Sequence, residues 1–103
     1  MTGLIPFPAP EADPEEAEVV ADGWFPPVKL ALVRDVVRLG DGTVPFARLV
    51  AAIESGMLHG FRELSVWRSA NASAGVTALE QVTEQQINRQ NLAVKLWERV
   101  VMY

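Results

Sequence analysis

The sequence contains no cysteine and, among its 103 residues, a single histidine, His59. The absence of cysteine excludes disulfide bonds and thiolate metal sites, and it is compatible with a reducing cytoplasm. No apolar run reaches the length of about eighteen residues that a membrane-spanning helix needs, so we expect no membrane association. The first residues also lack the basic start and apolar core of a secretory signal.

Groups that could carry out catalysis are equally scarce. A Ser–His pair would need His59, which we expect on the polar side of a helix rather than on a strand-to-helix elbow. His59 and Glu63 have the i, i+4 spacing of metal ligands, but one such pair without further ligands is a weak motif. The sequence has no glycine-rich phosphate loop ending in Gly-Lys-Ser/Thr. We therefore expect no enzyme activity, no metal and no cofactor.

Lysine and arginine are absent from residues 1–22, which hold six acidic residues. Residues 23–103 hold nine basic and seven acidic residues, so the net charge of −4 comes from the N-terminal segment. An acidic arm on a near-neutral body argues against broad nucleic-acid binding, which needs a concentrated basic face. The arm suits contact with a basic protein surface, or it is merely solvated.

The same segment is rich in proline, with Pro6, Pro8, Pro10 and Pro14. Proline fixes φ and removes an amide donor, so we expect an extended arm there. A PxxP-type ligand for an aromatic groove is an alternative, although such spacings are common. Asp13-Pro14-Glu15-Glu16 has capping-box spacing, which would fit a short helix over residues 14–21.

Three helices are expected after the arm. The first spans residues 28–39, and Gly40-Asp41-Gly42 then forms a turn. The second opens at Thr43 as N-cap and runs from about residue 44 to 70. Residues 71–75 end this helix, with Gly75 as its C′ residue. Residues 76–86 form a connecting loop, and Asn88 caps the third helix.

An apolar seam with heptad-like spacing marks the second helix, and a matching row marks the third. The expected core residues of this seam are Phe46, Val50, Ile53, Met57, Leu64 and Trp67, joined by Leu96 and Trp97. Gly56 and Gly60 interrupt the helix, which predicts either close approach of a neighbouring helix or a kink. The expected fold is all-α, a small helical bundle built on one long central helix. Residues 1–23 form its arm and residues 24–103 its domain.

Candidate partner contacts lie outside this seam. Aromatic residues in a proline-flanked segment either staple the arm to the bundle or form a partner hot spot. The candidates are Trp24 and Phe25 of that segment, Glu15 and Glu16 of the arm, and Arg62 and Arg68 of the long helix.

An ordered set of short motifs runs through residues 24–103. It comprises Phe25-Pro26, Arg38-Leu39 before Asp41-Gly42-Thr43-Val44, Arg48-Leu49, Glu63-Leu64, Trp67-Arg68, Gly75 and Leu96-Trp97-Glu98-Arg99-Val100. In this order the chain resembles the phage head completion protein family (GPL) of temperate phages with contractile tails. Phe61 departs from the pattern, because a polar residue is usual there. Family members also continue past the position of Tyr103, which implies a domain truncated at its C-terminus.

The resemblance implies a structural virion protein, a connector or adaptor without catalytic residues. Such proteins dock on the portal vertex after DNA packaging, help retain the genome and prepare the head for tail attachment. The implied partners are the portal protein, neighbouring copies in a twelve-fold ring, tail-side joining proteins and packaged DNA near the inner wall. The implied locations are the head–tail connector of the virion and, during assembly, the host cytoplasm.

A DNA-binding regulator is the competing hypothesis. The first helix, the Gly40-Asp41-Gly42 turn and the second helix would then form a helix-turn-helix. A recognition helix should be short and basic at its start, whereas this one begins with Val44, Pro45 and Phe46.

Overall fold

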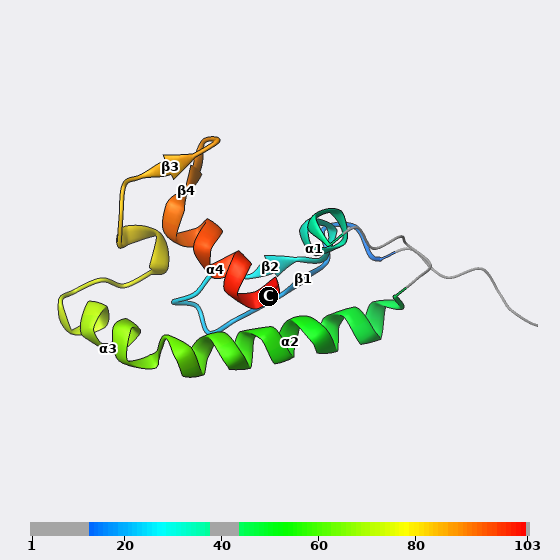
Figure 1. Ribbon diagram of the computed structural model, residues 1–103, viewed down its shortest axis with the longest axis horizontal. Coiled ribbons are helices and arrows are strands. Elements are labelled where there is room, and N and C mark those ends of the chain that lie inside the picture. The colour runs from blue at the N-terminus through cyan, green and yellow to red at the C-terminus, as the bar shows by residue number, and fades with distance from the viewer. Residues whose placement is uncertain (1–12, 38–43, 103) are drawn as a thin grey trace, which may run out of the picture.

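The computed structural model describes residues 13–37 and 44–102 (Figure 1). The proline-rich start, the Gly40-Asp41-Gly42 turn, the Thr43 cap and Tyr103 lie outside these ranges. The elements in chain order are β1 (Glu18–Val19), β2 (Val28–Lys29), α1 (Leu30–Val36), α2 (Phe46–Glu63), α3 (Ser65–Ser73), the 3₁₀ helix η2 (Leu79–Gln81), β3 (Gln86–Ile87), β4 (Gln90–Asn91) and α4 (Leu92–Met102).

The expectation of an all-α fold is wrong, because in the described residues two antiparallel two-stranded sheets accompany four α-helices. In the first sheet, Glu18 pairs with Lys29 and Val19 with Val28. The helix predicted over residues 14–21 does not form. Glu16 instead adopts a φ of 58°, which lies outside the helical region and turns the chain into β1. The helix predicted over residues 28–39 begins later than expected, because its first two residues belong to β2.

The second sheet is a hairpin, β3–β4, in the segment between η2 and α4. Its two turn residues, Asn88 and Arg89, have φ values of 53° and 65°, as a tight type I′ turn requires. Asn88 is therefore a turn residue and not the predicted helix cap. The cap is Asn91, whose Oδ1 accepts hydrogen bonds from the amides of Ala93 (2.9 Å) and Val94 (3.2 Å).

The predicted long helix is divided at Leu64 into α2 and α3. Leu64 has φ −103° and ψ 6°, so the helical path changes direction there, and in Figure 1 α3 leaves the line of α2. The predicted end at Gly75 is confirmed. Gly75 has a φ of 94°, and the Val76 amide donates to the carbonyl of Asn71 at 3.0 Å, which is a Schellman ending.

Close contact between α2 and α4 explains the two glycines of α2 (Figure 1). A Cβ atom added at Gly60 would lie 2.7 Å from Cζ3 of Trp97, and one at Gly56 would collide with the carbonyl group of Val101. Of the two readings, close approach of a neighbouring helix is therefore the one the structure shows.

Aromatic stacking joins α4 to the segment between the first two strands. The rings of Trp97 and Phe25 stack with centroids 4.2 Å apart, and both side chains are 1% exposed. The indole nitrogen of Trp97 donates to the carbonyl of Pro26 at 3.0 Å. Phe61 of α2 lies with its ring 5.7 Å from that of Trp97. The apolar residue at this unusual position thus joins the aromatic cluster.

The predicted seam is correct only in part. Ile53, Met57 and Trp97 are buried and Val50 and Leu64 are half-buried. Phe46, Trp67 and Leu96 are exposed, at 40, 39 and 57%. The buried stripe of α2 is Leu49, Ile53, Met57 and Gly60, which follows the 3.6-residue period of a straight helix. A heptad row drifts away from that period, so Phe46 leaves the core at the start of α2. Trp67 leaves the core because it lies on α3, beyond the change of direction at Leu64.

The described part of the arm, residues 13–23, packs on the body. Val19 is buried in the core, and Asp13 forms an ion pair with Arg34 of α1. The division of the chain at residue 23 stays a prediction.

We predict that Gly56→Ala lowers the free energy of unfolding, although alanine favours a helix by about 1 kcal/mol. The added methyl group would displace the backbone of α4 at Val101, and overpacking of this kind costs about 1–3 kcal/mol. Urea unfolding of the two proteins measures the difference. His59→Ala, an exposed change on the same helix, is the control and should not destabilise. A Gly56→Ala protein more stable than the parent would contradict the α2–α4 packing.

Candidate interaction surface

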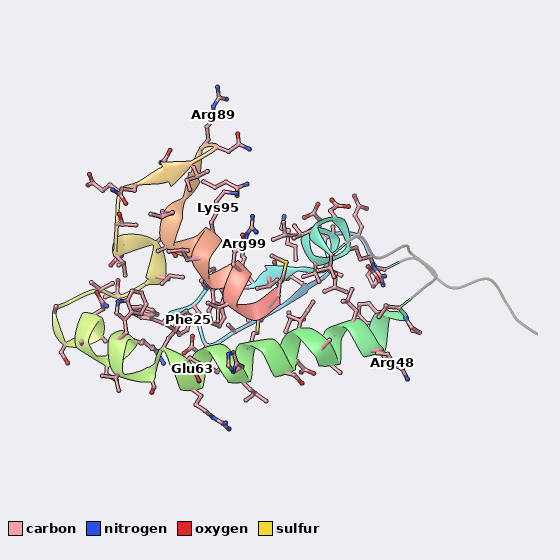
Figure 2. The ribbon with its side chains drawn as sticks, in the orientation of Figure 1. Phe25, Arg48, Glu63, Arg89, Lys95 and Arg99 are labelled. Carbon is pink, nitrogen blue, oxygen red and sulfur yellow. The ribbon has the colours of Figure 1, made fainter. Side chains whose placement is uncertain are left out.

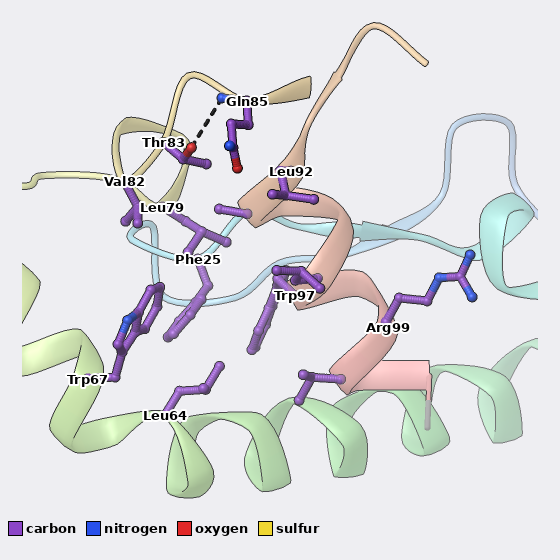
Figure 3. A pocket seen from close by; sticks show the side chains of 13 residues that line it. Phe25, Leu64, Trp67, Leu79, Val82, Thr83, Gln85, Leu92, Trp97 and Arg99 are labelled. Carbon is purple, nitrogen blue, oxygen red and sulfur yellow. Dashed lines mark hydrogen bonds between the residues drawn. The ribbon is translucent and has the colours of Figure 1, made fainter. Parts of the chain in front are cut away.

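An apolar groove of about 830 Å³ opens between α4, η2 and the junction of α2 with α3 (Figure 3). Phe25 and Trp97 line its inner part, Leu64 and Trp67 lie on the α2–α3 side, and Leu79 lies on the η2 side. Val82, Thr83, Gln85, Leu92, Ala93, Leu96, Arg99 and Val100 complete the lining. The groove exists because α4 turns Ala93, Trp97 and Val101 inward, which leaves Leu96 on its outer side.

Trp67 differs from the other two tryptophans in how its indole nitrogen is used. Those of Trp24 and Trp97 donate to the carbonyls of Val76 and Pro26, each at 3.0 Å. Trp67 makes an edge contact with Trp24, with centroids 5.9 Å apart, but its nitrogen has no hydrogen-bond partner within residues 13–37 and 44–102. A half-exposed indole in a groove offers both a flat apolar face and a free donor.

Two of the predicted partner-contact residues, Trp24 and Phe25, are buried, at 6 and 1% exposure. They therefore staple the N-terminal segment to the body. Arg68 lies over the Trp24 ring, 5.4 Å from its centroid, and pairs with Asp22 at 2.8 Å. Sequence reasoning missed the role of Asp22, whose Oδ1 accepts hydrogen bonds from the amides of Trp24 and Phe25. An Asp followed by Gly, as here, is the signal that indicates such a turn.

The other predicted contacts lie apart from the groove. Glu15 is exposed, and Glu16 pairs with Lys29 at 2.8 Å on an open surface. The Lys29 ammonium lowers the pKa of the Glu16 carboxyl, chiefly by hydrogen bonding. Arg62 is exposed on α2. The structure therefore does not bring the six candidates into one site.

A partly buried ion pair fixes the start of the described chain. Arg34, 6% exposed, donates from Nε to Oδ2 of Asp13 at 2.6 Å and from Nη2 to Oδ1 at 2.8 Å. Nη2 also donates to the carbonyl of Val44 at 2.9 Å, which ties the start of α2 to α1. Hydrogen bonding by Arg34 lowers the pKa of the Asp13 carboxyl, while desolvation opposes this shift.

Positive charge gathers beside the groove. Figure 2 shows Arg89 of the hairpin and Lys95 and Arg99 of α4 on the side of the molecule away from α2. Within the described residues none of the three forms a salt bridge. Partial burial raises the pKa of the neighbouring Glu98 carboxyl, and the charge of Lys95 opposes that rise.

The described ranges contain no group of three His, Asp or Glu residues placed to hold a metal ion. No helix in them is long and apolar enough to cross a membrane. His59 is exposed on α2.

Comparison with known proteins identifies relatives of this chain. The family model described as phage head completion protein (GPL) matches residues 19–103. A head completion/stabilization protein of Escherichia phage P2 is 34% identical over 99 residues. That match covers 96% of this chain and 57% of the phage P2 protein, so the chain spans less than two thirds of this relative. No solved structure matches the chain.

We predict that Asp13→Asn lowers the free energy of unfolding at neutral pH by about 1.5–3 kcal/mol, because the hydrogen bonds from Arg34 to Asp13 lose the charge of their acceptor. The pKa of Asp13 is lowered by folding, so its contribution is present above the ordinary carboxyl value of about 4 and is lost as pH falls through the folded value. Unfolding measured from pH 7 to pH 3 should thus show the difference shrinking. Glu15→Gln is the exposed control, and a difference independent of pH would contradict the account.

A second prediction separates the two groove tryptophans. Trp97→Ala should lower the free energy of unfolding by about 3–5 kcal/mol, because its ring is buried between α2 and Phe25. Trp67→Ala should cost less than about 2 kcal/mol, because a large part of its ring is already in water. If a urea titration shows that both changes lower the free energy of unfolding equally, Trp67 is a core residue and the groove does not serve as a binding surface.

Proposed function

The chain belongs to the phage head completion protein (GPL) family, and on this basis we propose that it is a structural protein of the phage head and not an enzyme. The match to the family model over residues 19–103 carries the proposal, because it includes every described element from Val19 onward. The geometry supports it: the body has a packed aromatic core and presents an apolar groove with a basic edge. Such a surface is suited to protein contact.

The proposed place of action is the portal vertex. The chain would dock there after DNA packaging as a ring of copies, twelve-fold by resemblance to the family, help retain the genome and offer a surface for tail-side joining proteins. It would be assembled in the host cytoplasm and remain in the virion at the head–tail connector, with packaged DNA near the inner wall. A ring suits a small body of this kind, because each copy can bury apolar surface on its neighbours.

The DNA-binding alternative makes α2 the recognition helix, and the described residues of α2 do not favour it. The buried face of α2 packs on α4, and its exposed face carries Glu54 and Glu63 beside Arg48 and Arg62. A surface of mixed sign gives little of the counterion release that drives binding to DNA.

Complementation in vitro tests the proposed function. Phage heads packaged in the absence of this protein should lose DNA and fail to join tails, and the purified chain should restore both. The release of DNA, measured by nuclease sensitivity, and plaque counts after addition of tails are the two readings. Heads that retain DNA and join tails without the protein would contradict the proposal.

Two variants, each with a leucine replaced by glutamate, test which surface of the protein carries the function. Leu96→Glu puts a charge in the groove, whereas Leu58→Glu puts it on the exposed side of α2, and both positions are more than half exposed. Leu96→Glu should reduce restoration at least about tenfold, and Leu58→Glu should restore as the parent does. The reverse order would place the functional surface on α2.

A further inference from the structure

Part of the apolar lining of the groove is exposed, and no segment of the described residues covers it. The chemistry of the lining indicates what could bind there. Leu96 is 57% and Trp67 39% exposed, and both line the same 830 Å³ space. Three aromatic rings lie in one lining: those of Phe25 and Trp97, each 1% exposed, form its floor, and that of Trp67 is the exposed ring. Contiguous apolar surface of this kind on a small body marks an interaction site.

The lining has the chemistry that binds proline-rich chains. Such segments adopt a polyproline II conformation without internal hydrogen bonds, and they dock in grooves lined by aromatic rings. Their carbonyl groups remain free to accept hydrogen bonds. Trp67 provides the matching donor, because its indole nitrogen is the one tryptophan nitrogen without a partner in the described parts of the chain.

The chain itself contains a segment of this type. Residues 4–10 read LIPFPAP, with three prolines, four other apolar residues and no charge. A polyproline II conformation has three residues per turn, so Leu4, Phe7 and Pro10 would share one side. Glu11 follows directly, which would bring a carboxylate to the basic edge formed by Lys95 and Arg99.

The position of Asp13 favours a segment from a second copy. Asp13 is held by Arg34 of α1, and α1 lies on the other side of α4 from η2 and the groove (Figure 1). Glu11 and Ala12 alone join residues 4–10 to that anchor, and the three steps from Pro10 to Asp13 reach at most about 10 Å. A segment of the same copy would therefore have to turn back across α4 to reach the groove, whereas one from a neighbour can lie along its length.

We propose that residues 4–10 of one copy bind in the groove of a second copy, between Trp67 and Leu96, so that the copies join head to tail. This deepens the proposed function by naming the contact between neighbouring copies. Head-to-tail contacts use two different surfaces of each copy, and they close into a ring where the rotation between copies permits.

Sedimentation of the purified full-length chain, without any other phage component, tests the contact. The parent chain should associate as its concentration rises. Phe7→Asp removes the ligand and Leu96→Glu removes the groove, so each should weaken association at least about tenfold. Thr2→Asp and Leu58→Glu are the matched controls for the same charges outside the contact, and both should associate as the parent does.

A mixture of the two impaired variants gives the decisive reading. Phe7→Asp keeps an intact groove and Leu96→Glu keeps an intact segment. In a mixture, the segment of a Leu96→Glu chain can therefore bind in the groove of a Phe7→Asp chain, and no other contact of this kind can form. An equimolar mixture should form one-to-one dimers and nothing larger, while each variant alone stays monomeric.

Three results would overturn the proposal. These are a parent chain that stays monomeric, association that survives Phe7→Asp or Leu96→Glu, and a mixture that forms no dimer. In the first case, a change in tryptophan fluorescence on Phe7→Asp that disappears in a Trp67→Phe background would place the segment in its own groove. Because no phage head takes part, failure here leaves the proposed function to be judged by complementation alone.

Discussion

The stack of Trp97 on Phe25 above Gly60 is the contact on which the rest of this structure depends. It joins α4, the segment that follows β1, and α2, three parts of the chain that are far apart in sequence. The ring fits because Gly60 has no side chain, and its indole nitrogen is satisfied by the carbonyl of Pro26. Trp97 is therefore held by stacking, burial and a hydrogen bond together. A change in one of the three parts of the chain that meet at Trp97 is transmitted to the other two.

The open groove is a direct consequence of this contact. Once α4 turns Ala93, Trp97 and Val101 toward α2, Leu96 must lie on its outer side. The change of direction at Leu64 then carries α3 and Trp67 away from the core and toward η2, which forms the opposite wall. The same packing that stabilises the body thus leaves an apolar surface for a partner.

Sequence reasoning succeeded where the signal is local and failed where it depends on distant segments. Gly75 ended its helix as predicted, because a left-handed residue after a helix is a local requirement. Gly56 and Gly60 indicated either a close neighbour or a kink, and nothing near them identified Trp97 as the neighbour. The strands β1 and β2 have two residues each, too few for an alternating pattern, and they form because Val19 and Val28 are buried together. The heptad spacing placed Phe46 and Trp67 in the core, whereas the buried stripe of α2 follows a 3.6-residue period and Trp67 lies beyond the change of direction at Leu64. The groove could not be predicted, because its walls come from residues 25, 64–67, 79–85 and 92–100.

We infer that the groove between α4, η2 and the α2–α3 junction is covered when the protein works. Hydrogen exchange of the chain, free and assembled on phage heads, measures this most directly. The account predicts that amides of the groove wall around Thr83 and Gln85 gain protection on assembly, while those on the exposed side of the hairpin turn at Asn88 do not. Protection confined to other surfaces, with the groove wall exchanging as in the free chain, would contradict it.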